Sequence, residues 1–70
     1  MGRRKREVGL GERYQARGQA YPQVWEVEYA YVDAQGIPHT RLFDVRCPAT
    51  KRTVATAVLL DNSRYFPVAS

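Results

Sequence analysis

The 70-residue chain has only one cysteine, Cys47, and one histidine, His39. A single cysteine excludes an internal disulfide, and these counts exclude a zinc site built from clustered thiolates and imidazoles. Apolar runs are also short: residues 57–60 form a run of only four, far below the roughly 20 residues of a membrane-spanning helix. We therefore expect a cytoplasmic protein with no cofactor, metal or membrane span, stabilised by packing or self-association alone.

Acidic residues are missing from residues 1–6, which carry Arg3, Arg4, Lys5 and Arg6. Residues 7–70 hold seven cations and seven acids, so the whole net charge of +4 lies in this N-terminal stretch. Adjacent cations repel one another and bury no apolar surface, so we predict a disordered basic tail over residues 1–8. Such a tail either contacts phosphates or anionic lipid, or serves only to keep the protein soluble.

Glycine and proline residues interrupt residues 9–70 at short intervals, and the segments between them are rich in β-branched and aromatic residues. This spacing predicts one all-β domain with strands near residues 12–17, 23–32, 39–47, 53–59 and 65–68. A helix competes for residues 53–59, but the β-branched side chains there favour a strand. We expect turns at residues 33–38 and 47–51, and a short 3₁₀ turn at residues 61–63 before the last strand.

The segment at residues 23–32 has the clearest strand pattern. A period of two places Trp25, Val27, Tyr29 and Tyr31 on one face, and the intervening glutamates on the other face. The side chains expected to be among the most buried are Trp25, Val27, Leu42, Val54 and Leu59.

Five short strands with a tight turn before the last strand are the plan of an SH3-like barrel. Residues 24–27, the turn at residues 33–39, and Leu59-Leu60-Asp61 followed by Tyr65 resemble small, uncharacterised bacterial SH3-like barrel proteins. The resemblance covers roughly residues 9–68 and implies a small five-stranded SH3-like barrel. It implies no activity, because those proteins have no established activity.

No residue pattern predicts catalysis. Ser63, Ser70 and Cys47 lack any nucleophile motif, so we expect His39 to bond a turn carbonyl or to lie on the surface. We expect Cys47 to be a small buried hydrophobic residue. The carboxylates at positions 26 and 28 are interpreted as solvated charges paired with Arg41 or Arg46, rather than as an acid–base pair. The chain is therefore predicted not to be an enzyme.

Aromatic side chains are too numerous for so small a core, so we expect some rings at the surface. There they could stack on bases or grip a peptide, or they could simply rim the core. The first hypothesis is a non-enzymatic nucleic-acid-binding module, and its candidate residues are Arg3, Arg4, Lys5, Arg6, Arg41, Arg46, Lys51, Arg52, Tyr29 and Tyr31. The alternative is a protein-interaction module that uses an edge strand or an aromatic groove.

Overall fold

A computed structural model describes residues 8–19 and 23–69, and within them five strands form one antiparallel sheet. The elements are β1 (Arg13–Ala16), β2 (Val24–Val32), β3 (Pro38–Asp44), β4 (Cys47–Ala55), α1 (Thr56–Leu59) and β5 (Tyr65–Val68). The order across the sheet is β4-β3-β2-β1-β5, so β4 and β5 are its edge strands. The prediction of a mostly β chain with five strands is confirmed, and β5 has the predicted bounds.

The connection between β3 and β4 differs from the prediction. β3 ends at Asp44, and a two-residue turn leads directly into β4 at Cys47, so the turn predicted over residues 47–51 is wrong. Asp44 sets this turn, because its Oδ1 accepts the backbone N–H of Arg46 at 2.8 Å. Pro48 then lies within β4, where an edge strand and an adjacent shift in the register of the β3–β4 ladder accommodate a residue that lacks an N–H donor.

The strand predicted to continue to residue 59 ends instead at Ala55, and the chain enters α1. A strand would have placed Thr56 and Leu59 on opposite faces, whereas one helical turn places them on the same side. Both are buried in this arrangement, and Leu59 is only 1% exposed. The Thr56 hydroxyl lies 2.7 Å from the buried Thr40 hydroxyl of β3, so the turn also satisfies a polar pair in the interior.

A β-bulge at Glu28 changes which residues of β2 face the interior. Val27 pairs with Leu42, but Tyr29 pairs with Arg41, so β2 contains one residue more than β3 at this point. Because Arg41 and Leu42 are consecutive and point to opposite faces, Tyr29 lies on the face opposite Val27. The prediction that both tyrosines of β2 share a face with Trp25 and Val27 is therefore wrong.

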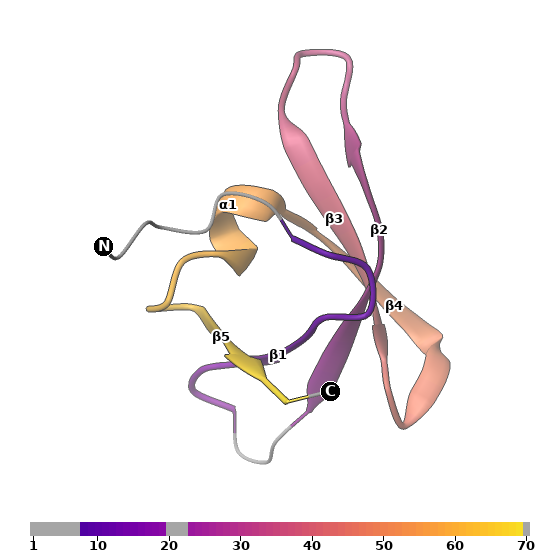
Figure 1. Ribbon diagram of the computed structural model, residues 1–70, viewed down its shortest axis with the longest axis vertical. Helices are drawn as coiled ribbons and strands as arrows, with labels where there is room; N and C mark the ends of the chain where they lie inside the picture. Colours follow the sequence, from indigo (N-terminus) through magenta and orange to yellow (C-terminus); the bar gives the residue numbers. More distant parts are fainter. Residues whose placement is uncertain (1–7, 20–22, 70) are drawn as a thin grey trace.

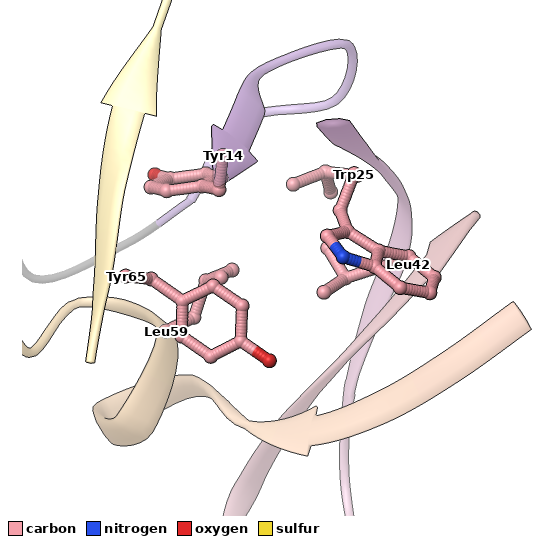
Figure 2. Packing of buried hydrophobic residues seen from close by; sticks show 6 residues of the cluster. Tyr14, Trp25, Leu42, Leu59 and Tyr65 are labelled. Atoms are coloured by element: carbon pink, nitrogen blue, oxygen red, sulfur yellow. The ribbon is translucent and has the colours of Figure 1, made fainter. Parts of the chain in front are cut away.

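The core contains one large side chain from nearly every element (Figure 2). Its buried hydrophobic residues are Tyr14, Trp25, Val27, Leu42, Leu59 and Tyr65. Val54 only packs against this cluster and is half-buried, contrary to the prediction, whereas the other four predicted core residues are buried. Burial, together with a hydrogen bond to the Glu12 carboxylate, raises the pKa of Tyr14 to about 12.

Arg52 of β4 contacts the core from the same side of the sheet. Its guanidinium carbon lies 4.3 Å from the centre of the Trp25 ring, in the geometry of a cation–π contact. Its Nη1 group donates a hydrogen bond of 3.0 Å to the Tyr65 hydroxyl on β5. A side-chain contact therefore joins the two edge strands of the sheet.

Candidate functional site

The hairpin formed by β2 and β3 projects beyond the rest of the molecule (Figure 1). Asp33 organises its turn: Oδ1 accepts the backbone N–H groups of Gln35 and Ile37, at 2.8 and 3.0 Å. Gly36 takes a φ of +82°, which glycine adopts without steric cost. The other carboxylate oxygen, Oδ2, lies 2.8 Å from Nε2 of His39. Of the two predicted environments of His39, a turn carbonyl or the surface, the structure shows a partly exposed ring held by a turn carboxylate.

Aromatic and cationic side chains gather on the outer side of this hairpin. Cross-strand partners point to the same side of a sheet, and the pairs here are Tyr29 with Arg41, Tyr31 with His39, and Phe43 with Lys51. We call these six residues the hairpin face. The two tyrosines of β2 are 43% and 42% exposed, so large parts of both rings are open to a ligand.

The rings of the hairpin face are held by contacts with one another and with cations. Tyr31 stacks on His39 with ring centres 5.4 Å apart, and Tyr29 follows at 6.0 Å from Tyr31. The Arg41 guanidinium carbon lies 5.9 Å from the Tyr29 ring centre, and no described residue accepts a hydrogen bond from the buried Nε of Arg41. These contacts limit the motion of the rings before any partner arrives, which lowers the entropic cost of binding.

Ion pairs neutralise most of the charge around the hairpin face. Lys51 Nζ lies 3.2 Å from Glu28 Oε1, and Arg13 Nε donates to Glu26 Oε1 at 2.9 Å. The two glutamates are paired across the sheet, as expected, but with these partners rather than with Arg41 or Arg46. Both pairs are partly exposed, and such pairs contribute little to stability. Their effect here is to keep the face close to neutral.

Several predicted residues lie elsewhere. Arg3, Arg4, Lys5 and Arg6 fall outside the described residues. Arg46 is exposed in the β3–β4 turn, and Arg52 packs over the core on the opposite side of the sheet. Of the six candidates that the structure describes, it brings together four, which are Tyr29, Tyr31, Arg41 and Lys51.

Sequence reasoning missed two members of the hairpin face. Phe43 was not placed beside Lys51 because the bulge and the register of β4 decide that contact. Tyr31 and His39 flank the turn between β2 and β3. This spacing was the sequence signal that could have identified them as cross-strand partners. Cys47 is exposed, so the prediction that it is buried is wrong.

The described ranges hold neither a metal site nor a membrane-spanning helix. Residues 8–19 and 23–69 contain no group of three or more His, Cys, Asp or Glu side chains that could hold a metal ion. Among the same residues, no helix has the length and apolar character needed to cross a bilayer. In comparisons with known proteins, no family model, curated protein or solved structure matches the chain.

Asp33 and Asp44, which stabilise the two hairpin turns, should make the stability of the fold depend on pH in the acid range. The N–H of Ile37 and the His39 side chain lower the pKa of Asp33, and the Gln23 amide and the N–H of Arg46 lower that of Asp44. A lowered folded-state pKa means stability that is present above the unfolded-state pKa and is lost as pH falls through the folded-state pKa. We expect the urea midpoint to fall on acidification below about pH 4, near the usual pKa of an aspartate in an unfolded chain.

The matched variants for this prediction are Asp33→Asn and Asp44→Asn. Each keeps an oxygen that can accept a backbone hydrogen bond but removes the titrating charge, so each should make the acid-induced loss of stability smaller than in the unmodified chain. A loss of the same size in both variants and the parent would show that these carboxylates are not its source.

Proposed function

We propose that this protein is a non-enzymatic module that binds single-stranded nucleic acid on the hairpin face. The observation that carries the proposal is the pair of half-exposed rings, Tyr29 and Tyr31, fixed beside Arg41 and His39 on one side of a projecting hairpin. Bases of any sequence can stack on exposed rings, and arginine adds cation–π contacts. Stacking on two neighbouring rings requires bases that are not already paired in a duplex.

Attraction to phosphates would come from outside this face. The hairpin face is nearly neutral because Lys51 and His39 each lie against a carboxylate. Counterion release needs unpaired cations, and the net charge of the chain resides entirely in residues 1–6. In this proposal, the affinity for the phosphate backbone of the nucleic acid comes from Arg3, Arg4, Lys5 and Arg6. The rings of the hairpin face bind the bases.

The proposal extends to the shape of the sheet. We propose that the five strands curl into a small SH3-like barrel, as the sequence resemblance implies. The strand order and the short helix between the last two strands support this proposal. The Arg52–Tyr65 hydrogen bond supports it too, because it joins side chains of the two edge strands. We also propose that the protein is cytoplasmic.

A second candidate function is protein interaction. The tip of the same hairpin exposes Val32 at 63% and Ile37 at 48%, so an apolar partner surface could cover it. Edge strand β4 could also add a strand from a partner, since an edge presents unpaired backbone donors and acceptors. This candidate uses the apolar tip or the sheet edge rather than the stacked rings.

Affinity measurements with ring variants separate the two candidates. Tyr29→Leu and Tyr31→Leu remove one stacking surface each, and stacking contributes about 1–3 kcal/mol per base. Each variant should therefore bind a labelled oligothymidylate about 5- to 150-fold more weakly in fluorescence anisotropy at low salt. Val32→Ser is the matched control on the same hairpin and should leave oligonucleotide affinity unchanged.

Two results would reject the proposal. If the full chain binds but both leucine variants bind equally well, the hairpin face is not the binding surface. If the full chain shows no binding even at low salt, nucleic-acid binding itself is rejected, and the protein-interaction candidate takes its place.

A further inference from the structure

A concave surface lies where the ends of β1 and β5 meet α1, and the hairpin face contributes none of its residues. This open depression is lined by Ala16, Arg17, Val58, Ser63, Arg64 and Tyr65. Two arginines supply hydrogen-bond donors, while an alanine, a valine and a tyrosine ring supply apolar surface. The combination suits a ligand with an anionic end and a small carbon group.

The two arginines of the depression are placed beside each other by the sheet. Ala16 pairs with Tyr65, and the next backbone contact is the N–H of Arg17 donating to the carbonyl oxygen of Arg64 at 2.8 Å. Like charges at facing positions of neighbouring strands repel and destabilise the pair. An anion bound between them would remove this repulsion, so the arrangement itself favours a negatively charged ligand.

Arg17 is held in position before any ligand binds. Its Nε group donates a hydrogen bond to the carbonyl oxygen of Asn62, and its guanidinium carbon lies 4.7 Å from the centre of the Phe66 ring. These contacts use Nε and one face of the guanidinium. No described residue accepts a hydrogen bond from its two terminal Nη groups, so they remain donors for a ligand. A guanidinium fixed in this way loses little entropy when an oxyanion binds.

One carboxylate lies close to Arg64, but it is shared. Asp61 Oδ2 is 3.9 Å from Arg64 Nε, a distance beyond a good hydrogen bond. Asp61 Oδ1 accepts both the backbone N–H and the hydroxyl of Ser63, at 3.0 and 2.8 Å. Asp61 thus shapes the turn that presents Ser63 and Arg64 to the depression. Among residues 8–19 and 23–69, one carboxylate lies against the two guanidinium groups, so this part of the depression is positively charged.

We propose that this depression binds a phosphate monoester. The phosphate dianion matches two guanidinium groups in charge, and its oxygens match the paired N–H donors of arginine. The organic group attached to the phosphate would lie against Val58, Ala16 and the Tyr65 ring. This site does not depend on the proposed function of the hairpin face.

The test is a titration of the isotope-labelled full chain, followed by the backbone amide signals of each residue at constant ionic strength. The probes are inorganic phosphate and phenyl phosphate, which share the anion but differ in apolar surface. Both should shift the amide signals of Arg17, Ser63 and Arg64 in a saturable way. Phenyl phosphate should bind more tightly, because only it can bury apolar surface in the depression.

Variants show whether the arginines carry the binding. Arg64→Gln changes an exposed side chain and should raise the dissociation constant for phenyl phosphate about tenfold or more, because it removes a charged hydrogen-bond donor. Arg46→Gln removes the same charge from the exposed β3–β4 turn and should leave that constant unchanged. Three results would each overturn the proposal. The first is an equal affinity of the two variants for phenyl phosphate, and the second is an equal affinity of the chain for the two probes. The third is a set of non-saturable shifts spread over all cations.

Discussion

Replacing Leu42 with alanine is expected to cost about 2–5 kcal/mol of the free energy of unfolding, because it removes a fully buried side chain and leaves a cavity. Leu42 has no exposed surface and belongs to the core cluster. Chains of this length are typically stable by only roughly 4–10 kcal/mol, so the loss is a large share of the total. Urea denaturation followed by tryptophan fluorescence measures it, since Trp25 belongs to the same cluster.

The matched control is Leu10→Ala. Leu10 is 76% exposed, so the same chemical change there should alter stability by no more than about 0.5 kcal/mol. If Leu42→Ala leaves too little folded protein to measure, Leu42→Val gives a smaller loss with the same sign. Equal effects at positions 42 and 10 would mean that the described packing is not the packing in solution.

Removing residues 1–6 is expected to eliminate much of the salt dependence of oligonucleotide binding. The remaining residues carry equal numbers of cations and acids, so the shortened chain has no net charge. On single strands, each neutralised phosphate contributes about −0.7 to the slope of log affinity against log salt. Four cations therefore account for a slope of up to about −2.8, and the shortened chain should lose up to that amount.

The comparison uses the full chain and a chain that begins at Glu7, both titrated with the same oligonucleotide over a range of salt concentrations. Circular dichroism of the two chains checks that both are folded. Identical slopes would reject Arg3, Arg4, Lys5 and Arg6 as the phosphate-binding element, even if the hairpin face still binds bases.

Several of the strands were predictable because their signals are local. Residues 65–68 lie between a turn of Asp, Asn and Ser and the end of the sequence, and their Tyr, Phe and Val side chains favour a strand. The alternation of Trp25 and Val27 likewise identified the buried half of β2. Such patterns depend only on neighbouring residues, so they indicate a strand in almost any all-β architecture.

The bulge at Glu28 was not predictable from alternation. Residues 23–32 follow a period of two without interruption, and nothing local indicates that β2 gains a residue relative to β3. Pairing with β3 decides the register, and that pairing depends on where Thr40 and Leu42 meet the core. The sequence therefore predicted exposed tyrosines without indicating which ones, and the bulge places Tyr29 and Tyr31 outside.

The end of β4 shows how the core can override local propensity. Thr53, Val54 and Thr56 favour a strand by their branched side chains, and the strand does continue to Ala55. Burial of Leu59 and the Thr40–Thr56 hydroxyl contact favour a helical turn beyond that point. Thr40 and Thr56 are 16 positions apart, so no pattern within residues 53–59 can indicate their contact.

The measurement that tests the account most directly is a titration of the isotope-labelled full chain with a short oligothymidylate, read residue by residue from backbone amide signals. If the hairpin face binds bases, the largest saturable changes occur at residues 29–31 and 39–43, on both strands of the hairpin. If the largest changes occur at residues 32–37, at β4 alone, or in the depression around Arg17 and Arg64, the hairpin face is not the nucleic-acid-binding surface.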